Sequence, residues 1–127
     1  MRPLPSASAP RVSILLPVRN AALTLSACLT SLTRQTETRW EGIIIDDGST
    51  DDTRTAALDA ARRDPRLRVV PIPHGGLIAA LNEGLRHCRA AYIARMDGDD
   101  VMHHDRLAAQ VHMLDTQHDL AAVGCHV

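Results

Sequence analysis

Three carboxylates lie within four positions of the sequence, at Asp97, Asp99 and Asp100. The mostly apolar run from Ala91 to Met96 comes directly before them and has the length of a strand. Like charges this close repel each other, and they stay ionised together only if a positive charge lies between them. A hard divalent cation with oxygen ligands is the natural partner. Asp and Gly are also common turn residues, so this acidic turn (97–100) is by itself more typical of a plain turn than of a metal site.

A second pair of carboxylates, Asp46 and Asp47, directly follows the apolar run Ile43–Ile45. In a parallel sheet the carboxyl ends of the strands meet at one edge, where ligands bind. The first predicted strand ends at the same edge and is followed there by Arg19 and Asn20. The sequence therefore predicts one crevice lined by an Arg, an Asn and two acidic turns.

A nucleotide fits this set of groups. One carboxylate can accept hydrogen bonds from a base or from ribose hydroxyls, and the other cluster can bind a metal that bridges two phosphates. The glycine-rich dinucleotide fingerprint and the Walker pattern are both absent after the first strand. Metal and Arg are therefore expected to neutralise the phosphates.

The elements that position these groups follow from the apolar pattern. Strands are predicted at 12–16, 40–46, 67–72, 91–96 and 120–125, and helices at about 20–35, 51–64, 77–88 and 105–114. Asn20 is predicted to cap the first helix, and Pro71 and Pro73 predict an edge position for the third strand. Gly84, on the apolar stripe of the third helix, predicts a close approach of that helix to the sheet. The alternation of strands and helices along the chain predicts an α/β fold, with a mostly parallel sheet and helices on both faces.

Length and composition set the remaining limits. The 127 residues are enough for one domain, and a formal net charge of -1 gives no global field for nucleic acid. The three cysteines, Cys28, Cys88 and Cys125, are odd in number and far apart in the sequence, which does not indicate a disulfide framework. Cys28 and Cys88 are read as small apolar core residues in a reducing compartment. Residues 1–11 are predicted to be a disordered tail, and no apolar run has the ~20 residues of a membrane span. We expect a cytoplasmic protein, with the inner face of a membrane as an open alternative location.

Several stretches, in order along the chain, together resemble family 2 glycosyltransferases of the GT-A fold. They are residues 12–20, 35–36, 45–51, 82–84, 92–100 and 105–107. The resemblance covers nearly everything from Val12 to Cys125. It implies that residues 12–127 are the nucleotide-sugar-binding, Rossmann-like part of a GT-A domain, which here ends before the acceptor half.

The resemblance implies inverting transfer of a sugar from a nucleoside diphosphate sugar, with a UDP-sugar as the expected donor and Mn²⁺ or Mg²⁺ as the cofactor. Asp47 corresponds to the carboxylate that pairs with the base, with Asp46 beside it. The backbone of Pro17 and Val18 would contact the nucleoside. The triplet 97–99 matches the DXD motif of the family, in which Asp99 would bind the metal and Asp97 would hold ribose or support the metal.

The chain departs from the family pattern at two positions, and it ends before the family's later motifs. Position 19 is Arg where many members have an aromatic residue that stacks on the base, and Ala21 stands where Glu is frequent. The catalytic base and the acceptor-binding half of the family lie beyond the point that corresponds to Val127, so the acceptor is unknown and no residue is assigned as base. A later strand lies beside the fourth strand in that fold. Its absence predicts a homodimer formed through the exposed sheet edge or the 120–127 segment.

Two alternatives stay open. A non-catalytic nucleotide-binding module would share the same site and would differ only in chemistry. A sugar-phosphate nucleotidyltransferase needs a glycine-rich loop with a basic residue after the first strand, and residues 17–20 do not have one.

Overall fold

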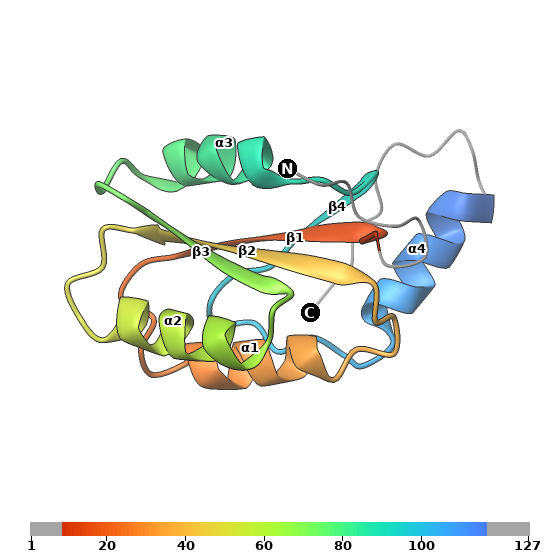
Figure 1. The fold of residues 1–127 in the computed structure, drawn as a ribbon, viewed down its shortest axis with the longest axis horizontal. Helices are drawn as coiled ribbons and strands as arrows, with labels where there is room; N and C mark the ends of the chain where they lie inside the picture. Colours follow the sequence, from red (N-terminus) through yellow and green to blue (C-terminus); the bar gives the residue numbers. More distant parts are fainter. Residues whose placement is uncertain (1–8, 117–127) are drawn as a thin grey trace.

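The computed structural model describes residues 9–116, which form a four-stranded sheet with four helices (Figure 1). The strands are β1 (Val12–Val18), β2 (Trp40–Asp47), β3 (Leu67–Ile72) and β4 (Tyr92–Arg95), and the helices are α1 (Leu25–Thr33), α2 (Thr53–Arg63), α3 (Leu77–His87) and α4 (Arg106–Thr116). The strand order is β3-β2-β1-β4, and every pairing is parallel. The predicted α/β class and the edge position of β3 are confirmed. The strand predicted at 120–125 lies outside the described residues.

The helices cover both faces of the sheet, as predicted: α1 and α2 lie on one face and α3 lies on the other (Figure 1). Side chains alternate along β2, so that Ile44 packs in the core cluster with α1, while Ile43 and Ile45 pack with Ala80 of α3. Because both faces are covered, all eight residues of β2 are buried.

Gly84 lets α3 lie directly on the sheet. A Cβ atom at this position would lie 2.7 Å from Cδ1 of Ile45 and 2.7 Å from Cδ2 of Leu15. The predicted close approach of this helix to the sheet is confirmed.

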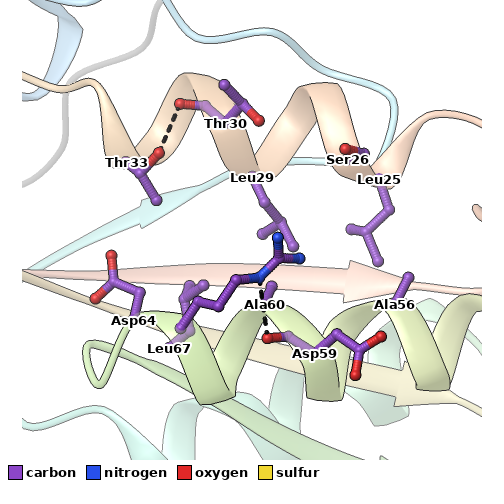
Figure 2. A pocket seen from close by; sticks show the side chains of 11 residues that line it. Leu25, Ser26, Leu29, Thr30, Thr33, Ala56, Asp59, Ala60, Asp64 and Leu67 are labelled. Carbon is purple, nitrogen blue, oxygen red and sulfur yellow. Dashed lines mark hydrogen bonds between the residues drawn. The ribbon is translucent and has the colours of Figure 1, made fainter.

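The helices on the other face leave a hollow between them. Figure 2 shows this hollow, of about 510 Å³, between α1 and α2. Leu25, Leu29 and Leu67 are among its apolar lining residues, and Asp59 and Asp64 are its acidic ones. Asp59 pairs with Arg62, and Asp64 pairs with Arg66, so both carboxylates already have partners.

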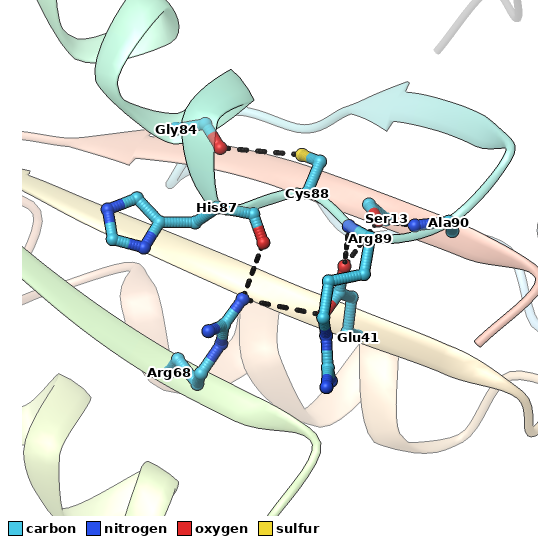
Figure 3. A network of polar contacts seen from close by, with 8 residues as sticks. All are labelled: Ser13, Glu41, Arg68, Gly84, His87, Cys88, Arg89 and Ala90. Carbon is cyan, nitrogen blue, oxygen red and sulfur yellow. Dashed lines mark hydrogen bonds and ion pairs between the residues drawn. The ribbon is translucent and has the colours of Figure 1, made fainter. Parts of the chain in front are cut away.

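The amino ends of the strands are joined by a polar network around Glu41, which is 2% exposed (Figure 3). Its carboxylate accepts hydrogen bonds from Ser13 Oγ of β1 at 2.5 Å and from the backbone N–H of Arg89 at 2.7 Å. The guanidinium groups of Arg89 and Arg68 pair with the same carboxylate at 2.9 and 3.5 Å. Burial alone would raise the pKa of Glu41, but the hydrogen bonds from Ser13 and Arg89 and the charge of Arg89 lower it.

Neither cysteine in the described part of the chain forms a disulfide: Cys28 is buried and Cys88 is half-buried. None of the helices between residues 9 and 116 combines the length and the apolar character that a membrane crossing requires. The predicted tail and the predicted dimer segment at 120–127 fall wholly or mostly outside the described residues.

Candidate functional site

Two hollows meet at the carboxyl edge of the sheet, each of about 280 Å³. The Asp47 hollow is lined by Pro17, Val18, Arg19, Asp47, His74, Gly76, Leu77 and Ala80. The Asp99 hollow is lined by Pro17, Val18, Arg19, Asn20, Ala21, Thr24, Gly98 and Asp99. Both hollows share residues 17–19, so the end of β1 lies between them. Asp47 is on one side of this strand end and Asp99 is on the other. The sequence predicts one crevice, and the structure has two adjoining hollows that share Arg19, with Asp47 in one and with Asn20 and Asp99 in the other.

Asp47 is almost fully buried, and its carboxylate is held by the loop that follows β3. The backbone N–H groups of Gly75 and Gly76 donate to it at 2.8 and 3.1 Å, and Nδ1 of His74 lies 3.0 Å away. Burial would raise the pKa of Asp47, but the hydrogen bonds from Gly75, His74 and Gly76 lower it. The side chain is thus an ionised acceptor at the wall of its hollow.

Gly48 explains how this loop can reach Asp47. Gly48 has a φ of +67°, and a Cβ atom here would lie 2.7 Å from the backbone nitrogen of His74. Only glycine combines this left-handed conformation with so close an approach. The contact of His74, Gly75 and Gly76 with Asp47 is not among the expectations drawn from the sequence. Their position at the carboxyl edge was the signal that could have found them.

Asp46 faces the opposite side of the sheet and lines neither hollow. It is fully buried, and it accepts hydrogen bonds from the backbone N–H of Ser49 at 3.1 Å and from Nε of Arg54 at 2.7 Å. Burial would raise the pKa of Asp46, but these contacts with Ser49 and Arg54 lower it. Asp46 therefore anchors the turn after β2 to α2.

Asn20 lines the Asp99 hollow but does not cap α1, so that prediction is wrong. It has a φ of +52°, and its side-chain oxygen accepts a hydrogen bond from the backbone N–H of Thr50 at 2.8 Å. Asn tolerates this left-handed conformation better than most residues. Thr24 takes the capping position instead, without a side-chain capping bond. Asn20 thereby joins the loop after β1 to the turn after β2.

Arg19 lines both hollows and is exposed. Its side chain makes no hydrogen bond or ion pair with any residue between 9 and 116. The guanidinium group is therefore available to an anion or to a flat ring.

The acidic turn brings Asp97, Asp99 and Asp100 together, with one carboxylate oxygen of each within 4.8 Å of the others. The backbone N–H of Asp97 donates to Oδ2 of Asp100 at 2.9 Å, which closes the turn. Arg95 pairs with Asp97 at 3.3 Å, and the side chain of Asp97 is 53% exposed. Three carboxylates at this spacing, two of them exposed, fit a hard divalent cation with oxygen ligands.

A second group of possible ligands, His103, His104 and Asp105, follows the acidic turn. The two imidazole rings stack with centroids 4.3 Å apart, and His104 pairs with Asp105 at 3.2 Å. All three side chains are exposed, and imidazole suits softer metals than Mg²⁺. We assign these residues no role in the site.

A family model described as glycosyl transferase family 2 matches residues 13–127. The chain belongs to the family 2 glycosyltransferases. The resemblance inferred from the sequence is confirmed.

Curated relatives of this family 2 glycosyltransferase agree with the match. The chain is 38% identical over 119 residues to EpsJ, an uncharacterized glycosyltransferase of Bacillus subtilis, and the match covers 91% of this chain and 33% of EpsJ. The chain is 34% identical over 104 residues to WfgD of Escherichia coli, a UDP-Glc:alpha-D-GlcNAc-diphosphoundecaprenol beta-1,3-glucosyltransferase, with 81% of this chain and 40% of WfgD covered. The chain thus spans well under half the length of these relatives.

Solved structures show the same fold. The mannosyltransferase PcManGT of Pyrobaculum calidifontis, in complex with GDP-Man and Mn²⁺, is 29% identical with a TM-score of 0.76, over 84% of this chain and 32% of PcManGT. TarS of Staphylococcus aureus, in complex with UDP, is 22% identical with a TM-score of 0.78, over 92% of this chain and 38% of TarS. This family 2 glycosyltransferase therefore has the expected GT-A fold.

The hollow between α1 and α2 (Figure 2) is larger than either hollow at the carboxyl edge, but none of the predicted site residues of this family 2 glycosyltransferase lines it. We place the site at the carboxyl edge despite its smaller hollows, because ionised acceptors and a free guanidinium converge only there among the described hollows.

Proposed function

We propose that this chain is the donor-binding part of an inverting glycosyltransferase that takes a nucleoside diphosphate sugar together with a divalent cation. One observation carries the proposal. Two hollows share the end of β1, with buried Asp47 in one and the acidic turn at the border of the other. A nucleoside diphosphate has a matching layout, because its flat, hydrogen-bonding base lies at one end and its charged diphosphate lies at the other.

The nucleoside occupies the Asp47 hollow in this proposal. Pro17, Val18, Leu77 and Ala80 supply apolar walls against which a base can pack. The Asp47 carboxylate accepts a hydrogen bond from a base N–H, as an ionised acceptor does best. Asp46, turned toward Arg54, contributes by fixing the turn and does not touch the donor.

The diphosphate occupies the Asp99 hollow, with Asp97 and Asp99 as the metal ligands. The cation, when bound, neutralises the charge that develops on the departing diphosphate. Arg19, between the two hollows and without a partner among residues 9–116, adds a second positive charge, while Asn20 and the backbone of residues 17–18 border the donor. The cofactor is Mn²⁺ or Mg²⁺, since both accept carboxylate ligands.

Relatives support this assignment. PcManGT was solved with GDP-Man and Mn²⁺, and the name of WfgD specifies a UDP-sugar donor. We propose a UDP-sugar as the donor of this chain. No residue between 9 and 116 is assigned to acceptor binding. None is assigned as the catalytic base, which takes the acceptor's proton during inversion.

Calorimetric titration with UDP and with GDP, each with and without Mn²⁺, tests the proposal. We expect UDP binding that Mn²⁺ strengthens, loss of the Mn²⁺ effect in Asp99→Asn, and an unchanged Mn²⁺ effect in the control Asp59→Asn. Metal-dependent binding that survives the double change Asp97→Asn with Asp99→Asn would overturn the assigned metal site. Release of sugar from a UDP-sugar by this chain alone would exclude the non-catalytic alternative.

We also propose that the free edge of β4 pairs with a second copy of the chain. β4 has only β1 as a neighbour among the described strands, and Ile93 in it is 49% exposed. An unpaired strand edge favours such association. Sedimentation at rising concentration should reveal a dimer, and a monomer at every concentration would overturn this proposal.

A further inference from the structure

Side chains on one face of α1, and on the residues just before and after this helix, contact the backbone of the segment 97–107. Thr24, Cys28, Ser31 and Gln35 are spaced four, three and four residues apart, which places them in one row along a helix. Each of the four hydrogen-bonds a backbone group of that segment. The row and the segment are about 70 positions apart in the sequence, so these bonds tie the acidic turn and the residues after it to a distant stretch of the chain.

The first two contacts hold the acidic turn itself. Oγ1 of Thr24 donates to the carbonyl oxygen of Gly98 at 2.9 Å, and Sγ of Cys28 donates to the carbonyl oxygen of Asp97 at 3.5 Å. These two carbonyls belong to the DXD triplet. The turn also lies close to the chain beneath it, since a Cβ atom at Gly98 would be 3.0 Å from Cγ1 of Val18.

The other two contacts hold the segment that leaves the turn. Oγ of Ser31 accepts from the backbone N–H of Met102 at 2.9 Å. The amide of Gln35 donates to the carbonyl oxygen of His103 at 2.7 Å and accepts from the backbone N–H of Leu107 at 3.1 Å. Ser31 and Gln35 are 8% and 4% exposed, so the loss of either would leave a polar backbone group buried without a partner.

We propose that Thr24, Cys28, Ser31 and Gln35 are positioning residues for the cation site: α1 fixes the backbone of the acidic turn so that the carboxylates of Asp97 and Asp99 are held at ligand spacing. The proposal rests on the proposed function, since it assumes that the acidic turn binds a divalent cation. The backbone of the turn is anchored from α1, while the carboxylates of Asp97 and Asp99 stay exposed. A ligand set held in place in this way loses little freedom when the cation binds.

The test compares Mn²⁺ affinity with metal-free UDP affinity in matched variants. Thr24→Val removes the hydroxyl while nearly keeping the shape, Thr24→Ser keeps the hydroxyl, and Thr30→Val makes the first change at an exposed position that lines the hollow between α1 and α2. Ser31→Ala and Ser26→Ala form a second pair with the same logic. We expect Thr24→Val and Ser31→Ala to weaken Mn²⁺ binding by about tenfold. The metal-free UDP affinity should be unchanged in Ser31→Ala, because Ser31 lines neither hollow at the carboxyl edge.

Thr24→Ser, Thr30→Val and Ser26→Ala should bind Mn²⁺ like the unmodified chain. Equal Mn²⁺ affinity in Thr24→Val and the unmodified chain would overturn the positioning role, even if Asp99→Asn abolishes binding. Failure of the unmodified chain to bind Mn²⁺ would instead overturn the proposed function. Thr24 is exposed at the start of α1, so its variants should fold even if Ser31→Ala does not.

Discussion

The backbone N–H of Gly75 donates a hydrogen bond to the carboxylate of Asp47 across 2.8 Å, which ties the loop before α3 to the end of β2. Three groups donate to or pair with this carboxylate, and an Asn at position 47 would present an NH₂ group to at least one N–H donor. Asp47→Asn should therefore lower the Tm and weaken UDP binding by about tenfold or more, as the loss of a charge-assisted bond implies. Thermal melts and UDP titrations check both effects.

Asp59→Asn on α2 is the control for that change, since Asp59 makes an exposed ion pair with Arg62 and lines neither hollow at the carboxyl edge. It should leave the Tm and UDP affinity nearly unchanged. If Asp47→Asn bound UDP as tightly as the control does, Asp47 would not be the base acceptor.

Two glycines near the same loop have a positive φ, and comparing them distinguishes the cost of backbone strain from the cost of a steric clash. Gly48 has a φ of +67° and close contacts with His74, whereas Gly76 has a φ of +92° and no heavy atom within 4 Å of the point where a Cβ atom would lie. Gly76→Ala should cost about 1 kcal/mol from backbone strain alone, and Gly48→Ala should cost about 2–3 kcal/mol because strain and clash add. Urea denaturation of both variants measures the difference, and equal losses would show that the loop can move away from Gly48.

The acidic strand ends were predictable because apolar runs stop at carboxylates and because parallel strands share one carboxyl edge. The different roles of Asp46 and Asp47 also follow from the period of two along a strand, which places neighbours on opposite faces. Asp46 shares its face with Ile44 and meets Arg54 of α2, whereas Asp47 shares its face with Ile45. The sequence places Asp46 beside Asp47 as a further donor-binding residue, and the alternation of the strand puts the two side chains on opposite faces of the sheet.

The contacts made by the 74–76 loop were harder to predict. They depend on the left-handed conformation of Gly48 and on a hydrogen bond to Asp47 from a residue 28 positions away. Local propensity carries no information on such a pairing, because it arises only when the chain folds. The same holds for Asn20, whose preference for helix caps was outweighed by its bond to Thr50, 30 positions away.

Buried Glu41 predicts an acid-sensitive fold. The pKa of Glu41 is lower in the folded chain than its ordinary value, so its contribution to stability is complete above the unfolded pKa, roughly 4.3, and is lost as the pH falls through the folded pKa. Glu41→Gln should cost about 2 kcal/mol at pH 7, because the new amide faces the Arg89 guanidinium. Urea denaturation at pH 7 and pH 3 should show the cost shrinking at the lower pH.

Glu83→Gln serves as the control for Glu41, since Glu83 lies on α3 with its side chain 33% exposed. Its effect should stay within about 0.5 kcal/mol at either pH. A cost for Glu41→Gln that is the same at pH 3 and pH 7 would contradict the role of the ionised carboxylate.

The Cys28 thiol should be nearly inert in the folded chain. Burial, followed by the charges of Asp100, Asp99 and Asp97, raises the pKa of Cys28 to about 12, and the side chain is fully buried. Since the thiolate is the reactive form, a thiol reagent at pH 8 should label Cys28 only as fast as the chain opens locally. Mass spectrometry of labelled peptides can separate Cys28 from Cys88, which is half-buried and should react sooner. A cation bound by the acidic turn would oppose the local opening that exposes Cys28, so Mn²⁺ should slow its labelling further, and this protection should be absent in Asp99→Asn. Labelling of Cys28 at the rate of the urea-unfolded chain would contradict its burial beneath the acidic turn.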